Sequence, residues 1–493
     1  MTKRGIHLGY WGAIPVWLAA MFMRPLHEDG AEHIHVAWLQ ATLELDPMRD
    51  FFQHHTPLLW DLLRVYYLLG GEGLGVVYYG RTLVVLAGIL TVAGFWQLGR
   101  QLRRGPRTYP PGMLAVAFFI FATVTLDKLL LIRAETVGIP LVVWSLVLWA
   151  RPLQYRLGWD LISGMLVGLA AFASPRFVLM GGMFLILNSD PAKLLVTDLR
   201  RYIVLTVGAL FAVVAYLFAK GMSVADFRFI LEFSALLQHQ GEGDVSFSRN
   251  YLFVLGVAGF VFWRLYQAGG GGHGRAWLLD LALLLVVMLA NLVVAGDHPF
   301  HHAFAPMALL IPLLLIRAEE RVDNQGPLRD LYYGVVLVIW VYTISMREHS
   351  LARSYNLLTD VELKREVLEV VPPGASILAF PHYHPIAMAD ASYYARPLGV
   401  GRLCEVVAAS PPDWGLPPCD YLADIKSRQP LLVTRRLKGL IGPTTTKQQL
   451  QAHMEEYYVK TPCYYVRADK DPDGSITAAL MEHRRCTSTS SNR

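Results

Sequence analysis

Long apolar runs separated by short polar clusters make up the first two-thirds of the chain. A helix needs about 20 residues to cross the hydrocarbon core of a membrane. Several runs are shorter, so they must use flanking Trp, Tyr and Arg residues or form tight hairpins. The pattern predicts about 11 spans. The runs lie at 8–23, 74–98, 113–126, 137–150, 161–173, 177–187, 202–218, 251–266, 276–294, 304–316 and 331–344.

The last third of the chain has a globular pattern instead. Residues 375–380, 430–434 and 463–466 are typical of strands, and 446–459 is typical of an amphipathic helix. We therefore predict a membrane part at 1–346, with a first outer loop at 25–73, and a small α/β domain at 347–485. A disordered tail at 486–493 completes the chain.

Composition supports a polytopic membrane protein. The 493 residues are 54% hydrophobic and only 17% charged, whereas soluble domains carry about 25% charged residues. A soluble enzyme would have to hide all the apolar runs in one core. The chain has no long basic block of the kind that binds nucleic acid. It also has no phosphate-cradling glycine loop, which argues against a nucleotide-driven pump.

The polar clusters predict the orientation in the membrane. Arginine and lysine gather in the connections after even-numbered spans, whereas the first outer loop is rich in Asp and Glu. The positive-inside rule therefore places the N-terminus in the cytoplasm, and an odd number of spans places the C-terminal domain outside. The basic residues are Arg100, Arg103, Arg104, Arg107, Arg151, Arg156, Lys193, Arg200, Arg201, Arg264, Arg275, Arg317, Arg321 and Arg329.

All four cysteines follow the last predicted span. An even number confined to an outer region indicates one or two disulfides, with three possible pairings. Four separate buried thiols are the alternative interpretation. The cysteines are Cys404, Cys419, Cys463 and Cys486.

The first outer loop opens with the sequence HEDGAEHIH, which crowds carboxylates and imidazoles beside the hydrocarbon. Ionisable groups at membrane depth are candidates for function. Asp29 followed by Glu32 also has the spacing of a helix capping box, which would explain the pair without chemistry. Together with His33 and His55, the acids Glu28 and Asp29 could instead hold a divalent metal, although no tight metal-binding spacing is present.

Further ionisable residues lie on the same predicted face of the membrane. The stretch 49–60 is aromatic, contains His55 and suggests an interfacial helix, with Pro57 beginning the next element. A lone arginine near a helix end is often only an anchor whose charge reaches the interface. The other candidates are Arg81, Arg133, Glu135, Arg176, Arg249, His301 and His302.

The order of these features resembles the GT-C superfamily of glycosyltransferases. The likeness rests on an acid after the first span, an aromatic stretch ending in a proline, a basic-x-acidic pair before span four, and a histidine pair ahead of an Ala-Pro-containing span. It is closest to the dolichyl-phosphate-mannose protein mannosyltransferases and the lipid A aminoarabinose transferases, and it covers residues 5–345. The family's Asp-Glu pair is here Asp29-Gly30 with Glu28 in front, so either acid can be the match. We favour Asp29.

The resemblance implies transfer of a sugar from a polyprenyl-phosphate lipid to a hydroxyl of a protein, lipid or polysaccharide on the outer face of the inner membrane. Catalytic roles then fall to Asp29, Glu32 and Glu135, and acceptor or loop support to Glu28, His33, His55 and Arg133. Binding of the donor phosphate falls to Arg176, Arg249, His301 and His302. No nucleic acid takes part, and no cofactor is required beyond the metal considered above. A lipid or solute transporter without covalent chemistry is the alternative, as is a membrane-anchored binding or sensor protein.

Overall fold

The computed structural model describes 3–26, 28–45, 55–102, 112–126, 130–151, 156–175, 177, 199–239, 249–268, 305–321, 334–345, 369–372, 375–378, 420–434, 445–462 and 464–482, with single positions at 278–285 and 357–365. The chain forms two compact units. The helical unit contains 1–24, 55–59 and 81–353, and the mixed unit contains 25–54, 60–80 and 354–493. The domain boundaries at 346 and 485 stay predictions.

The helical unit consists of helices that coincide with the apolar runs. Nine predicted runs are helical, whereas 177–187 and 276–294 lie almost entirely outside the described residues, so the number of spans stays a prediction. The helices are α1 (Lys3–Met23), α4 (Gly75–Leu102), α5 (Met113–Leu126), α6 (Ala134–Trp149), α7 (Arg156–Ala171), α10 (Leu199–Lys220), α12 (Arg249–Ala268), α14 (Ala305–Arg321), a last helix at Gly334–Ser345, and the unpredicted α11 (Val224–His239).

The apolar surface of these helices suits a lipid environment. Among the described residues, α4 and α10 are long and apolar enough to cross a membrane, and six further helices are apolar but shorter. The outward face of α10 is apolar along its length, with Ile203, Leu210, Val214 and Phe218 each more than half exposed. Six charged residues described in the same bundle are buried, although charged side chains are rarely buried in soluble proteins. They are Arg81, Arg133, Glu135, Asp160, Arg201 and Glu319.

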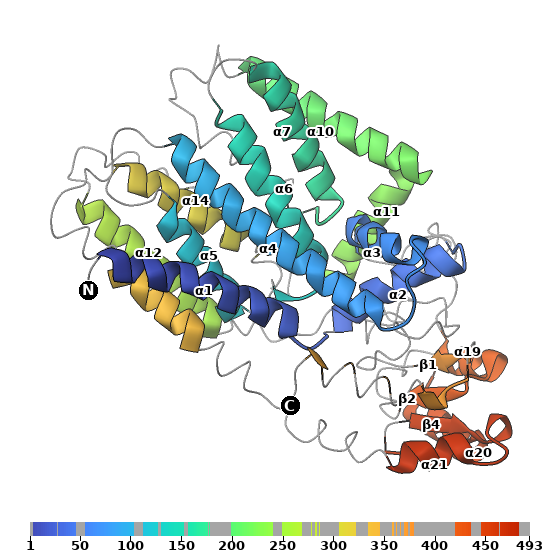
Figure 1. The fold of residues 1–493 in the computed structure, drawn as a ribbon. Helices are drawn as coiled ribbons and strands as arrows, with labels where there is room; N and C mark the ends of the chain where they lie inside the picture. Colours follow the sequence, from blue (N-terminus) through green and yellow to red (C-terminus); the bar gives the residue numbers. More distant parts are fainter. Residues whose placement is uncertain are drawn as a thin grey trace. The chain divides into compact units, whose positions relative to one another are not determined.

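Helices α6, α7 and α10 lie side by side (Figure 1). Helices α7 and α10 approach each other closely because glycines lie at their contact. A methyl group on Gly164 would collide with the carbonyl oxygen of Leu205, and one on Gly208 would collide with that of Leu161. Small residues that let two backbones approach are typical of helix pairs in membranes.

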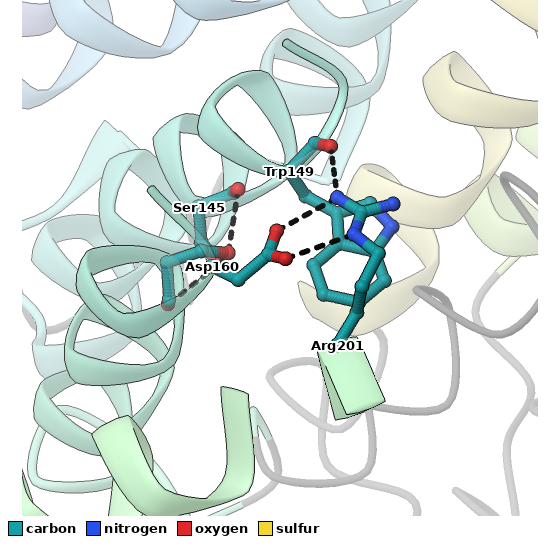
Figure 2. A network of polar contacts seen from close by, with 5 residues as sticks. Ser145, Trp149, Asp160 and Arg201 are labelled. Atoms are coloured by element: carbon teal, nitrogen blue, oxygen red, sulfur yellow. Dashed lines mark hydrogen bonds and ion pairs between the residues drawn. The ribbon is translucent and has the colours of Figure 1, made fainter. Parts of the chain in front are cut away.

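A buried ion pair fastens the same three helices, as Figure 2 shows. Nε and Nη2 of Arg201 on α10 donate to the two carboxylate oxygens of Asp160 on α7, at 2.9 and 2.7 Å. Nη2 also donates to the carbonyl of Trp149 at 2.7 Å, and the guanidinium lies 3.7 Å from the centre of the Trp149 ring. Ser145 and Ser163 exchange hydrogen bonds of 2.8 and 2.9 Å beside this pair.

A second part of the bundle joins α5, α12 and α14, which pack against one another. Glu319 of α14 is buried and accepts hydrogen bonds from the backbone N–H groups of Gly112 and Leu114, at 3.0 and 3.2 Å. These groups belong to the first turn of α5 and its approach, where no intrahelical partner exists. A carboxylate of the bundle therefore caps the most apolar helix.

The mixed unit contains α2 (Glu28–Thr42) and a four-stranded sheet, and most of α3 (Leu58–Leu68) belongs to it. The strands are β1 (Ile377–Leu378), β2 (Leu432–Thr434), β3 (Tyr458–Lys460) and β4 (Tyr464–Arg467), in the order β1-β2-β4-β3. Only β1 and β2 are parallel. Three helices accompany the sheet: α19 (Tyr421–Arg428), α20 (Lys447–Tyr457) and α21 (Ser475–Glu482).

The small α/β domain is confirmed as a mixed sheet with helices, with one correction. Strands β1, β2 and β4 fall within or beside the predicted strands. The predicted helix at 446–459 ends at Tyr457, because Tyr458–Lys460 pairs with β4 as an edge strand. Thr446 and Gln449 form the capping box that begins α20. The four cysteines lie outside the described residues, and the disulfide stays a prediction.

We predict that Asp160→Asn destabilises the bundle by about 3–5 kcal/mol, because it leaves the buried charge of Arg201 without its carboxylate. Thermal unfolding of the detergent-solubilised protein measures the effect. The double variant Asp160→Leu/Arg201→Met removes both charges and should recover most of the loss. Glu232→Gln, which breaks the exposed pair with Arg228, is the control and should leave the midpoint unchanged. Equal midpoints for Asp160→Asn and wild type would contradict this account.

Candidate active site

The N-terminus of α6 carries a buried ion pair. Nε of Arg133 donates to Oε2 of Glu135 at 3.3 Å, and the two side chains are only 5% and 10% exposed. Arg133 is the N-cap residue, with an extended backbone, and Glu135 lies in the first turn, where a negative charge is favourable. The predicted basic-x-acidic pair is therefore one unit that holds its arginine in a fixed place.

The turn after α7 packs against the same end of α6. Gly138 lies one turn beyond Glu135, and a methyl group there would collide with the ring of Phe177 and lie 2.8 Å from Cβ of Ala173. The turn is closed by a hydrogen bond of 3.0 Å from the N–H of Phe177 to the carbonyl of Ser174. Only a glycine at 138 lets the turn come this close.

The segment before α3 is attached to this turn by two hydrogen bonds. Oγ1 of Thr56 donates to the carbonyl of Ala173 at 2.8 Å, and the N–H of Leu58 donates to the carbonyl of Phe172 at 2.9 Å. Thr56 and Ala173 are both buried. Pro57 directly precedes α3, as the sequence predicted.

Three distant segments thus meet within the helical unit. We call this the α6 junction: residues 55–58, 130–138, 172–175 and Phe177. It contains the half-buried His55 and the pair of Arg133 with Glu135. Arg176 lies outside the described residues, as do His301 and His302. Arg249 is the first residue of α12, and its side chain is outside the described part.

The predicted residues of the first outer loop belong to α2 in the mixed unit. Asp29 is the second residue of α2, because the helix begins at Glu28. The capping-box interpretation was therefore wrong, since it requires Asp29 just outside the helix, at the N-cap. The side chains of Glu28 and Asp29 lie outside the described part, and Glu32 is half-buried. An acid in the first turn is still favoured by the helix dipole.

His33 is held in one tautomer. Nε1 of Trp60 donates to Nδ1 of His33 at 2.8 Å, with both residues buried. Because Nδ1 accepts, a neutral His33 carries its proton on Nε2. His35 stacks on Trp38, with ring centres 5.6 Å apart, and burial lowers the pKa of His35 to about 3. The buried His35 is therefore neutral near pH 7.

The metal interpretation stays open as a prediction. Within the described ranges, no group of three or more His, Cys, Asp or Glu side chains is arranged to hold a metal ion. The side chains of Glu28 and Asp29 lie outside those ranges.

Sequence reasoning missed the residues that assemble the α6 junction. Thr56 follows the His-His pair of the aromatic stretch, and Gly138 lies three residues after Glu135. A small residue one turn from a charged pair in a predicted span is the signal that could have indicated a close approach.

The fold is similar to that of solved ArnT structures, in line with the resemblance that the sequence predicted. Two structures of ArnT from Cupriavidus metallidurans, a lipid A aminoarabinose transferase, match with a TM-score of 0.59. The structure bound to undecaprenyl phosphate is 13% identical, over 90% of this chain and 96% of that one. The apo structure is 14% identical, over 94% and 98%. No protein-family model and no curated protein matches the sequence. At this identity the match establishes the fold.

We predict that Gly138→Ala loosens the α6 junction, because the added methyl group displaces the turn at 172–177. Overpacking costs about 1–3 kcal/mol, so local opening should become about ten- to hundredfold more frequent. Hydrogen exchange of peptides that cover 55–59 and 172–177 measures it. Gly158→Ala is the matched control, because nothing lies within 4 Å of its added methyl group. Unchanged exchange at 172–177 in Gly138→Ala would show that the close approach is not made.

Proposed function

We propose that this protein is a membrane glycosyltransferase that moves a sugar from a polyprenyl-phosphate lipid to a hydroxyl acceptor on the outer face of the inner membrane. The observation that carries the proposal is the fold shared over 90% of the chain with an ArnT structure bound to undecaprenyl phosphate. The α6 junction also supports it, because three distant segments pack together there, and two of them contain His55 and the pair of Arg133 with Glu135.

The donor side requires positive charge. As the bond between the anomeric carbon and the phosphate oxygen breaks, negative charge grows on the departing phosphate. A fixed guanidinium stabilises such charge well, because it costs no reorganisation during the reaction. Arg133 has this property, since Glu135 holds it in place at 3.3 Å. We therefore propose this role for Arg133 in place of the acceptor or loop support that the sequence suggested, and we keep it for Arg176, Arg249, His301 and His302, as the resemblance implies.

The acceptor side requires a base. The acceptor oxygen attacks the anomeric carbon, polyprenyl phosphate leaves with the electron pair of the broken bond, and the hydroxyl proton passes to a carboxylate. We assign this carboxylate to Asp29, in the first turn of α2. Glu135 suits a different task, because its carboxylate already accepts from Arg133. Glu32 keeps its predicted catalytic role beside Asp29, and Glu28, His33 and His55 support the acceptor and the loop.

The apolar helices suit a long lipid donor. The exposed stripe of α10 and the short apolar helices indicate a protein within a bilayer, where a polyprenyl chain also resides. The positive-inside rule puts the acidic first loop and the C-terminal domain outside, so we place the reaction there. Such a donor already carries its leaving group, so no nucleotide is needed.

We predict that Asp29→Asn slows sugar transfer by about 10²–10⁴-fold, because an amide cannot accept the proton. The assay supplies the purified protein in liposomes with a panel of labelled undecaprenyl-phosphate sugars and an added extract of cell-envelope proteins, lipids and polysaccharides as acceptors, and it measures the label transferred. Binding of unlabelled undecaprenyl phosphate and the thermal midpoint should both stay at wild-type values. Glu28→Gln is the matched variant, and comparing the two variants shows which of the neighbouring acids, Glu28 or Asp29, accepts the proton.

Three results would count against the assignment. Near-normal transfer by Asp29→Asn together with loss in Glu28→Gln moves the base to Glu28. Loss of folding along with activity makes Asp29 a structural residue of α2. Binding of the donor by wild type without transfer to any acceptor indicates a lipid transporter rather than an enzyme.

A further inference from the structure

A fully buried arginine lies in α4, two turns from its start. Arg81 is 0% exposed, and its Nη1 donates to the carbonyl of Leu130 at 2.9 Å. Leu130 is also fully buried and precedes α6 by four residues. The guanidinium is therefore enclosed by protein and does not lie at the surface, as an anchoring arginine would. A charged side chain buried in an apolar helix is expensive and is a candidate for function.

The contact of Arg81 fixes one end of the loop that leads into α6. The other end is fixed by Thr136, whose Oγ1 donates to the carbonyl of Leu131 at 3.1 Å and whose N–H donates to that of Arg133 at 3.2 Å. Arg133 lies between the two points of attachment. Its side chain is fixed in turn by Glu135. The position of this guanidinium thus depends on a loop held at both ends.

A second buried arginine provides the comparison. Arg201 is 3% exposed and also donates to a backbone carbonyl, that of Trp149. Trp149 is the last residue of α6 and Glu135 lies in its first turn. At about 1.5 Å per residue, the two ends of α6 are about 20 Å apart. The two arginines therefore hold opposite ends of one helix, and only Arg81 adjoins the loop with Arg133.

We propose that Arg81 is a positioning residue for the active site. It holds the carbonyl of Leu130 and so sets the loop that presents Arg133 to the phosphate of the donor. This role rests on the proposed function. An error of about 1 Å in the place of a catalytic group can cost about a hundredfold in rate, so such support is needed. The planar guanidinium fixes the direction of the hydrogen bond to Leu130 as well as its length. A lysine at position 81 would therefore recover only part of the positioning.

The test is a double-mutant cycle between Arg81→Met and Arg133→Met. Each single variant should lower the rate of transfer from labelled undecaprenyl-phosphate sugar about ten- to hundredfold, because each loses a hydrogen bond to a charged group. If Arg81 acts through Arg133, the double variant should be no slower than Arg133→Met alone. Arg81→Lys should lie between Arg81→Met and wild type. Additive losses in the cycle would overturn the proposal.

Two controls separate this role from general stability and from the proposed function. Asp160→Leu/Arg201→Met removes the other buried arginine, and it should leave the rate per folded molecule unchanged. Hydrogen exchange over 130–136 needs no activity, and it should rise in Arg81→Met and stay unchanged in that control. If wild type transfers no sugar, the proposed function fails, and the same cycle is then measured on binding of undecaprenyl phosphate. Unchanged exchange over 130–136 in both Arg81→Met and Arg81→Lys would overturn the positioning role.

Discussion

The close approach at Gly138 is the contact on which the candidate active site depends. It lets the turn at 172–177 pack against the first turns of α6, where Phe177 and Ala173 occupy the space of a side chain. Thr56 and Leu58 then attach a third segment to that turn through its carbonyl groups. Van der Waals packing and hydrogen bonds can hold helices together where lipid gives no hydrophobic driving force. A methyl group at position 138 would collide with Phe177 and Ala173 and so displace the turn from α6.

The helical unit buries several charged side chains and exposes many apolar ones. Buried ion pairs gain little net stability, because the cost of removing two charges from water offsets their attraction. Their value lies in fixing geometry. Arg201 with Asp160 fixes three helices at one end of α6, and Arg133 with Glu135 fixes a single guanidinium at the other. One helix therefore has a structural network at its C-terminal end and a candidate catalytic one at its N-terminal end.

The sequence predicted the elements better than their junctions. The bounds of α5 agree with the apolar run at 113–126, because that run is apolar on all sides. Helix α6 begins at Ala134 rather than at 137, because Glu135 lies inside its first turn and meets Arg133. The hydrophobic pattern places Arg133 and Glu135 outside the span, because charged residues usually end one. Their pairing allows both to be buried. Strand β3 was missed because Tyr458–Lys460 continues the pattern of the helix before it.

The α6 junction itself could not be derived from local pattern. Thr56 and Ala173 are 117 positions apart, and their hydrogen bond uses a backbone carbonyl that no residue type reveals. The histidine, the basic-x-acidic pair and the proline turn were recognised as candidates, since ionisable residues beside apolar runs are conspicuous. Only the tertiary structure shows which of these segments lie together. The resemblance implied the sugar-transfer chemistry. The shared fold and the α6 junction now allow us to propose where in the protein the donor phosphate binds.

The most direct test of the α6 junction as the donor site is a cryo-electron microscopy structure of the protein with bound undecaprenyl phosphate. We expect density for the phosphate beside Arg133 and the turn formed by Ser174, Pro175 and Phe177, with the polyprenyl chain running along apolar helices. A phosphate bound elsewhere, for example at the end of α6 near Arg201, would contradict it. A phosphate that makes no contact with Arg133 or with the turn would also contradict it.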